Sequence, residues 1–402
     1  MKQLIFLFSL IILFGCKSTK AVYHIPIKDV NKTKKLVVFM DGTMNNASSY
    51  TNVSKLYNLT ILQDEVNINA TYIVGVGNHG LGLMTGVGIG KTVRDAYLFI
   101  SKNYHSKHND EIYIFGFSRG AYAARILAGM IHVAGITDLS AISEKDQEAY
   151  VKKIYKAYSL DQTIYNRREN VSKVTGEIPK SVNIEFLGLW ETVEALGIPN
   201  FKEGYNVPNK KYVDQLCNVK KAAHALSIND DRATIFTPKL LTEPYLISKC
   251  EKPVNIDKIV NEVWFSGSHS DVGGGYGDTE IDGLSLNWMI NEIKPYHLLP
   301  ETTKIFEDKN GEIHDPANGL IEIFYKRKFR NMKIYSENST YNKGVIKINK
   351  SVISRLSNPD ILPFQDFEHN LPNQFPSCFQ QLENGTYLFV KSKVCPLEIV
   401  TK

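Results

Sequence analysis

The 402-residue chain has no block of lysine and arginine long enough to form a nucleic-acid-binding patch. Its formal net charge of +5 is spread thinly along the sequence. Internal repeats and low-complexity tracts are also absent, which argues against repeat architectures and linker-like sequences. The composition, with 43% hydrophobic and 22% charged residues, is that of a folded globular protein. We therefore expect no nucleic-acid partner.

Cysteine is scarce, since the sequence contains five, and no pair has the CxxC spacing of metal ligands. We accordingly expect no metal site at these cysteines, and nothing else in the sequence calls for a metal or an organic cofactor. If the protein is exported, disulfides are permitted, and Cys378 with Cys395 would close a C-terminal loop. The sequence alone does not establish that bond.

An apolar run long enough to span a membrane is also missing at the N-terminus. Leu4–Phe14 is apolar, but a spanning helix needs about 20 such residues. With the charged start before it, this run has the pattern of a secretory signal over residues 1–15. Its LFGC ending resembles a bacterial lipoprotein box, in which Cys16 is lipidated; an ordinary signal peptide is the alternative. We expect a lipid-anchored protein on the periplasmic or outer-membrane face, with residues 16–34 as a flexible tether.

Short apolar runs bounded by turn residues alternate with helical patterns along the next part of the chain. Such runs are typical of buried parallel strands. Strands are expected at 35–40, 70–77, 111–117, 182–190 and 259–267, and helices at 91–104, 118–131, 142–170, 212–227 and 284–293. This alternation predicts a doubly wound, mostly parallel α/β sheet over residues 35–299. Residues 300–402 are expected to form a C-terminal elaboration of the same domain, outside the central sheet.

The pentapeptide GFSRG at residues 116–120 matches G-x-S-x-G. An apolar strand enters it and a helix rich in small residues leaves it, which is the context of a nucleophile elbow. Gly116 and Gly120 would permit the cramped turn, and the helix N-terminus would place positive potential beside Ser118. The pattern therefore predicts Ser118 as a nucleophile; a serine at an ordinary helix N-cap is the alternative.

A serine nucleophile needs a base, and the base needs an acid that fixes its tautomer. His269 directly follows a strong apolar strand and is expected in a loop. His224 lies in AAHALSI, a helical pattern typical of a satisfied core histidine. Glu191 closes the strand IEFLGLW. In the chain order serine, acid, histidine, we expect Ser118, Glu191 and His269 to form a triad, with Asp230 or Asp231 as alternative acids.

The glycine-rich segment SGSHSDVGGGYGD at residues 266–278 has three possible interpretations: a phosphate loop, a metal loop or the site of a catalytic histidine. Its glycines follow the histidine instead of leading into a lysine and a helix, which argues against phosphate. Asp271 and Asp278 are its only carboxylates, short of the oxygen set that calcium needs. We expect the glycines to let the loop double back beneath His269, with Asp271 holding the turn.

An oxyanion hole requires two main-chain amides near the nucleophile. The amide of Arg119, directly after Ser118, is expected to be one of them. The other is expected from the loop after the first strand, at Gly42 or Thr43, with Asp41 supporting that loop. A plain turn is the alternative for this stretch.

Five blocks of the sequence resemble, in this order, those of a family of bacterial and fungal α/β-hydrolases: FMDGTMNN, IYIFGFSRGAYAARILAGMI, FLGLWETVEALG, AAHALSINDDR and WFSGSHSDVGGGY. That family includes the first class of type VI secretion phospholipase effectors. The resemblance covers roughly residues 35–295 and implies an α/β-hydrolase fold with serine esterase or phospholipase activity. It also implies Ser118 as nucleophile, His269 as base and Glu191 as acid.

Three features depart from that family's pattern. Glu191 stands where the family has aspartate, within a W/F-D-T-V motif, and Asn229 stands where the family often has aspartate. The lipoprotein-like N-terminus is the third, because injected effectors are usually not made as lipoproteins. The resemblance thus supports the chemistry more than it supports a role as a toxin.

Together these patterns predict a serine hydrolase of carboxylic esters, most simply a phospholipase or lipase that acts at a membrane. Two alternatives remain open at the level of sequence. One is an esterase that acts on acylated polysaccharide or peptidoglycan. The other is a non-catalytic surface lipoprotein that keeps the hydrolase fold.

Overall fold

The computed structural model describes residues 33–62, 67–75, 88–159, 163–194, 215–233, 236–277, 280–316, 326–337, 342–361 and 370–401, together with the main chain of residues 21–24. The expected signal at residues 1–15 and the lipidation site Cys16 lie outside these ranges. Of the expected tether, Ala21–His24 forms strand β1, which pairs antiparallel with β3, so that part is a strand and not a flexible linker. Within the described ranges, no helix is both long and apolar enough to cross a membrane.

The centre of the fold is a nine-stranded sheet with the order β1-β3-β2-β4-β5-β6-β8-β10-β13. Its other strands are β2 (Lys35–Met40), β3 (Ile68–Ile73), β4 (Glu111–Phe117), β5 (Phe186–Trp190), β6 (Ala222–Ser227), β8 (Val260–Phe265), β10 (Ile346–Asn349) and β13 (Leu397–Val400). Every neighbouring pair is parallel except β1 with β3. The predicted α/β-hydrolase-like, mostly parallel sheet is confirmed.

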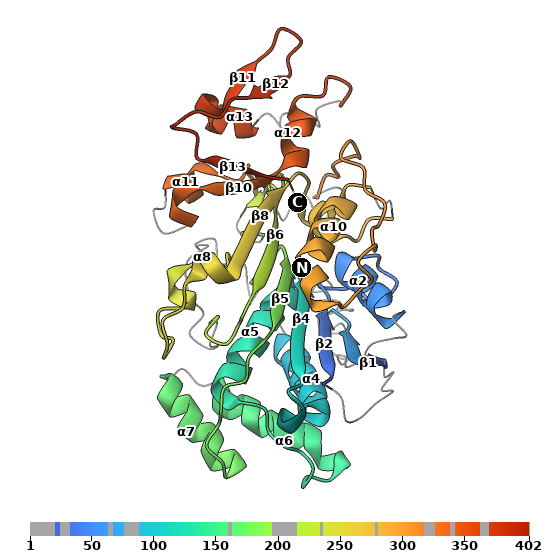
Figure 1. The fold of residues 1–402 in the computed structure, drawn as a ribbon, viewed down its shortest axis with the longest axis vertical. Coiled ribbons are helices and arrows are strands. Elements are labelled where there is room, and N and C mark those ends of the chain that lie inside the picture. Colours follow the sequence, from blue (N-terminus) through green and yellow to red (C-terminus); the bar gives the residue numbers. More distant parts are fainter. Residues whose placement is uncertain are drawn as a thin grey trace, which may run out of the picture.

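Helices cover both faces of this sheet (Figure 1). One face carries α4 (Ile89–Asn103), α5 (Arg119–Ala134), α6 (Glu144–Tyr158) and α7 (Ile164–Thr175), and the other carries α2 (Asn52–Ile61) and α10 (Asp282–Ile293). Strands β2 and β4 have nearly continuous apolar sequences because successive side chains enter opposite cores. In β2, for example, Val38 packs with the α4 and α5 side while Phe39 packs with α2 and α10.

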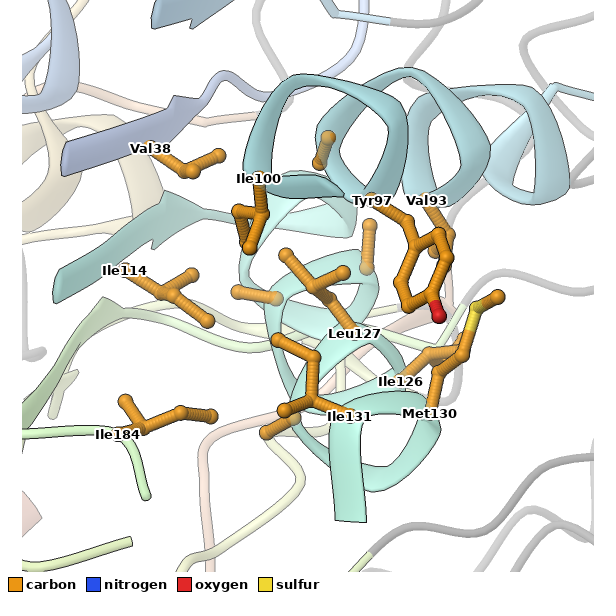
Figure 2. Close-up of a cluster of buried hydrophobic side chains, with 14 of the residues drawn as sticks. Val38, Val93, Tyr97, Ile100, Ile114, Ile126, Leu127, Met130, Ile131 and Ile184 are labelled. Atoms are coloured by element: carbon orange, nitrogen blue, oxygen red, sulfur yellow. The ribbon is translucent and has the colours of Figure 1, made fainter. Parts of the chain in front are cut away.

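Helix α5 is the central helix of the first face, and all of its residues are buried. Figure 2 shows Leu127 and Ile131 of α5 facing Ile114 of strand β4, which ends directly before Ser118. Its many alanines let the helix approach the sheet closely, because each removes side-chain bulk at little cost in helix propensity. This packing fixes the N-terminus of α5 at the carboxyl end of β4.

Shorter elements complete the fold. The remaining helices are α8 (Ile256–Ile259), α9 (His269–Gly273), α11 (Lys333–Glu337), α12 (Lys350–Leu356) and α13 (Asn370–Gln374), and the short strands are β7 (Arg232–Ala233), β9 (Lys326–Arg327), β11 (Phe379–Gln381) and β12 (Tyr387–Phe389). Disulfides join Cys217 to Cys250 and Cys378 to Cys395. The second bond closes the C-terminal loop as the sequence suggested, whereas the first was not expected.

The structure corrects three expectations about secondary structure. The expected helix at 212–227 is strand β6 over residues 222–227, and the expected helix at 142–170 is the pair α6 and α7. Strands β10 and β13 extend the central sheet, so residues 300–402 are not only an external elaboration. Ile346 and Ile348 are buried while Lys347 between them is half-exposed, the alternation of a strand near a sheet edge.

Candidate active site

Ser118 lies at the sharp turn between β4 and α5, with a left-handed main chain (φ 56°, ψ −124°). A non-glycine residue rarely adopts such a φ, and a buried one that does is a feature of strained functional turns. Its N–H donates to the carbonyl of Trp190 at 3.0 Å, which ties the turn to the end of β5. The Ser118 residue is 6% exposed. The geometry is that of a nucleophile elbow.

The glycines on either side of this turn are required by close approach. A Cβ on Gly116 would lie 2.6 Å from the Cα of Ala121, and one on Gly120 would lie 2.2 Å from the carbonyl oxygen of Met40. Side-chain carbon atoms do not approach the main chain so closely, so any larger residue would push α5 away from β2 and β4. The two glycines let α5 start directly above the strand ends.

His269 follows β8 as the first residue of the short helix α9, and not in a loop as the sequence suggested. The helix begins with a capping box, in which the Asp271 carboxylate accepts hydrogen bonds from the Ser268 amide at 2.7 Å and its hydroxyl at 2.9 Å. The Ser-x-x-Asp spacing is the sequence signal that could have predicted this helix. Asp271 also bonds the ring of His314 at 2.6 Å, so its carboxylate joins the start of α9 to that ring.

The imidazole of His269 lies in an aromatic environment. Its ring centroid is 4.7 Å from that of Phe117 and 4.8 Å from that of Phe236. Burial in this environment lowers the pKa of His269 below its usual value, although the neighbouring carboxylate of Glu191 opposes the shift. The neutral imidazole, which can accept a proton, is therefore favoured near neutral pH.

Glu191 lies directly after β5, again with a positive φ of 41°, and is fully buried. Its Oε2 is 3.4 Å from Nδ1 of His269, and its Oε1 accepts the Ser227 amide at 2.6 Å. The guanidinium of Arg330 binds both oxygens, at 2.9 and 3.0 Å. Burial alone would raise the pKa of Glu191, but Arg330 and His269 outweigh it and lower the pKa to about 2. The carboxylate is thus anionic throughout the usual pH range.

Sequence reasoning did not find Arg330, and no local pattern marks it. It lies beyond the last of the resembling blocks, in the part of the chain expected to be an elaboration. Only the tertiary fold brings it to the end of β5.

The alternative acids contact His269 differently or not at all. Asp230 accepts a hydrogen bond from the main-chain amide of His269 at 3.0 Å and forms an ion pair with Arg232. Asp231 forms an ion pair with Arg327 instead. Of the three carboxylates predicted as the acid, Glu191 is therefore the one that bonds the imidazole ring.

Asn229, the second departure from the family pattern, also acts on the main chain of this loop. The side-chain Oδ1 of Asn229 accepts a hydrogen bond from the main-chain N–H of Gly267 at 2.7 Å. The main-chain N–H of Asn229 donates to the carbonyl of Gly267 at 3.1 Å. These two bonds fix the strand end two residues before His269.

The expected oxyanion loop lies beside Ser118, because a Cβ on Gly42 would come within 3.1 Å of the Ser118 Cβ. The N–H of Gly42 donates to the side chain of Asp41 at 2.6 Å, so this amide is already paired. Thr43 is then the better of the two predicted donors in this loop. Its hydroxyl accepts a hydrogen bond from Nε of Arg119, which links the loop to the first turn of α5.

The carboxylate of Asp41 holds this loop by hydrogen bonds. Besides the Gly42 amide, its carboxylate accepts hydrogen bonds from the hydroxyls of Thr51, at 2.5 Å, and Tyr72. Burial raises the pKa of Asp41 to about 6, although these hydrogen bonds oppose the shift.

Phe117, the residue before Ser118, packs its ring on the imidazole of His269, and this contact connects the two candidate catalytic residues. The His269 ring contacts the Glu191 carboxylate. Within the described part of the chain, no hydrogen bond joins the Ser118 hydroxyl to that ring. Catalytic hydrogen bonds are often long without substrate and tighten in the complex.

His224 is a core residue, as expected, although it lies in strand β6 and not in a helix. Its ring bonds the Glu262 carboxylate at 2.7 Å and accepts the Thr192 amide at 3.2 Å. Among the described residues, no group of three or more histidine, cysteine, aspartate or glutamate side chains could hold a metal ion.

Comparisons with known proteins give relatives of limited similarity. An uncharacterized protein of Saccharomyces cerevisiae is 30% identical over 200 residues, which cover 43% of this chain and 28% of that protein. The chain therefore spans less than a third of the length of this curated relative. The solved structure of the Tle1 effector bound to the VgrG spike of the type VI secretion system is 22% identical, covers 63% of this chain and 53% of that one, and has a TM-score of 0.33.

Other solved structures show lower identity. Esterase 2 of Thermogutta terrifontis is 13% identical, covers 70% of this chain and 91% of that one, and has a TM-score of 0.35. A family model described as the phospholipase effector Tle1-like catalytic domain of the type VI secretion system matches residues 34–292. Because this match covers more than half of the chain, the protein belongs to the family of Tle1-like phospholipase effector catalytic domains.

Proposed function

We propose that the protein is a serine hydrolase that cleaves the carboxylic esters of phospholipids, with Ser118, His269 and Glu191 as its triad. One observation carries the proposal: the strained, glycine-flanked turn holds Ser118 at the N-terminus of α5, and the ring of the preceding residue, Phe117, packs on an imidazole that contacts a buried carboxylate. Family membership supports phospholipid as the substrate class.

In this mechanism the Ser118 oxygen attacks the ester carbonyl carbon while Nε2 of His269 takes the hydroxyl proton. The imidazolium then gives that proton to the leaving alcohol, and the acyl group stays on Ser118. A water molecule, deprotonated by the same imidazole, then attacks the acyl-enzyme, and the imidazolium returns that proton to the Ser118 oxygen as the fatty acid is released. Glu191 fixes the tautomer of His269 and stabilises the imidazolium.

The negative charge on the carbonyl oxygen would be held by the amides of Arg119 and Thr43. Arg119 lies at the N-terminus of α5, where the helix dipole adds positive potential. The hydrogen bond between the Arg119 side chain and the Thr43 hydroxyl would keep the two amides at a fixed separation. In serine proteases, removal of one preorganised donor of this kind costs about 3–4 kcal/mol of transition-state stabilisation.

The location of the enzyme is a separate part of the proposal, and it rests on the sequence of the N-terminus. Residues 1–15 would act as a signal peptide, Cys16 would carry the lipid, and residues 35–299 would form the catalytic domain. A lipid anchor would hold the site at a bilayer, next to its substrate. The two disulfides are consistent with export into an oxidising compartment.

Substrate profiling tests the proposed substrate class. The purified protein is assayed on phospholipid vesicles, on a soluble short-chain ester and on acetylated polysaccharide or peptidoglycan, with Ser118→Ala as the inactive control. We expect fatty-acid release from phospholipid that Ser118→Ala abolishes. Turnover of acetylated sugars without turnover of phospholipid would replace the substrate class, and activity on none of them would favour a non-catalytic protein.

A further inference from the structure

Arg330 lies outside the part of the chain that matches the family, yet it reaches the centre of the candidate site. Its side chain is 8% exposed. Two of its nitrogens bind two different oxygens of one carboxylate, Nη1 to Oε1 of Glu191 at 2.9 Å and Nη2 to Oε2 at 3.0 Å. This bidentate arrangement is the strongest form of an arginine–carboxylate pair, because it fixes the orientation of both planes.

The rest of the guanidinium is held by main-chain carbonyls. It donates to the carbonyl of Ser227 and, at 2.8 Å, to that of Phe236. The carbonyl of Arg330 itself accepts a hydrogen bond from Gln374 at 3.0 Å. Hydrogen bonds thus hold both the guanidinium and the main chain of Arg330, which keeps its positive charge next to the Glu191 carboxylate.

The charges around Glu191 come from three parts of the chain. Arg330 comes from the C-terminal region, His269 from α9, and Asp230 from the turn after β6, with its partner Arg232 at the start of β7. The attraction of Glu191 and Asp230 raises the pKa of Arg330 above its usual value, although burial opposes this shift. A fully buried carboxylate without such a partner would take up a proton.

We propose that Arg330 is the positioning residue for the acid of the triad: it orients the Glu191 carboxylate against His269 and keeps it ionised. This inference rests on the proposed triad. It also means that the segment matched by the family model lacks one component of the working site, which the C-terminal region supplies.

The test compares Arg330→Gln, Arg330→Lys and the control Arg327→Gln in the full-length protein, with a soluble ester as substrate. Arg327 is a suitable control because it lies in the same segment and binds Asp231 and Asp315, which do not bond His269. We expect Arg330→Gln to lower kcat by roughly 10²-fold with little change in KM. Arg330→Lys keeps the positive charge but not the pair of parallel hydrogen bonds, so it should recover part of the lost kcat. Arg327→Gln should stay close to wild type.

The pH profile separates this role from a purely structural one. Without Arg330, burial would raise the pKa of Glu191, so the acid limb of the kcat profile should move to higher pH in Arg330→Gln. A uniform loss at every pH, or wild-type kcat and an unchanged profile, would overturn the proposal. Either result can be told apart from failure of the triad itself, because Ser118→Ala is tested in the same assay.

A double-mutant cycle keeps the proposal testable if Arg330→Gln alone is unstable. In Glu191→Gln the carboxylate is gone, so adding Arg330→Gln should lower kcat by less than about threefold more. The double variant should also melt at a higher temperature than either single variant, because each single change leaves one buried charge unpaired. Losses in kcat that multiply would contradict the proposed coupling.

Discussion

Asp230 accepts a hydrogen bond from the main-chain amide of His269, with 3.0 Å between its Oδ2 and the nitrogen, while Glu191 contacts the ring of the same residue at 3.4 Å. Two buried carboxylates therefore act on one histidine at different points. Asp230 fixes the main chain of His269, and Glu191 contacts its imidazole ring. In the proposed mechanism, this division gives Glu191 the role of orienting and stabilising the imidazole.

The first prediction separates these two carboxylates. Glu191→Ala should lower kcat by at least about 10²-fold, because the imidazole loses both its orientation and its counter-charge. Asp230→Asn keeps an acceptor for the His269 amide, so its loss should be less than about tenfold. Steady-state kinetics on a soluble ester measures both. A larger loss in Asp230→Asn than in Glu191→Ala would move the acid role to Asp230.

The second prediction concerns the elbow. Gly120→Ala places a methyl group 2.2 Å from the carbonyl oxygen of Met40, and we expect it to destabilise the protein by about 1–3 kcal/mol and to abolish turnover. Gly277→Ala is the matched control, because a Cβ there meets no atom within 4 Å. Thermal unfolding and activity are measured on both. Equal melting temperatures for the two variants would argue against the close packing of α5 on β2.

The third prediction follows from the pKa of Asp41, which burial raises to about 6. A carboxyl group with a raised pKa binds its proton more tightly in the folded state than in the unfolded state. Its contribution to stability is therefore full below the unfolded pKa of about 4 and is lost as the pH rises through about 6. Asp41→Asn should flatten the pH dependence of the free energy of unfolding in this window. An unchanged slope in denaturant titrations would show that Asp41 ionises normally.

The fourth prediction tests the anchor. Cys16→Ser should move the protein from the membrane fraction to the soluble fraction of the host, because a lipid chain can no longer be attached. Cys378→Ser, which removes a cysteine of the C-terminal disulfide, is the control and should stay with the membrane. Membrane association of Cys16→Ser equal to that of the unchanged protein would remove the lipoprotein part of the proposal.

The parts of the fold that follow from local pattern were predictable. β2 and β4 are continuous apolar runs ending in turn residues, and the Gly-x-Ser-x-Gly elbow joins such a strand to an alanine-rich helix. The runs are apolar because both faces of a parallel sheet are buried, and this leaves a pattern that can be recognised within a few consecutive residues.

Other parts depend on contacts between distant residues. Ala222–Ser227 has a helical composition but forms the buried strand β6, because pairing with β5 and β8 overrides the local helix propensity. Arg330 could not be predicted as a partner of Glu191, because the two are 139 residues apart and no pattern links them. The addition of β10 and β13 to the sheet, together with the pairing of β9 with β7, brings the C-terminal region near the site.

Labelling by a fluorophosphonate probe tests the central claim most directly, because the probe reacts with an activated serine and needs no knowledge of the substrate. The wild-type protein should be labelled at Ser118, and Ser118→Ala should not be labelled at all. Ser248→Ala, which changes an exposed serine, should be labelled as fully as wild type. Labelling that survives in Ser118→Ala would contradict the assignment of Ser118 as the nucleophile.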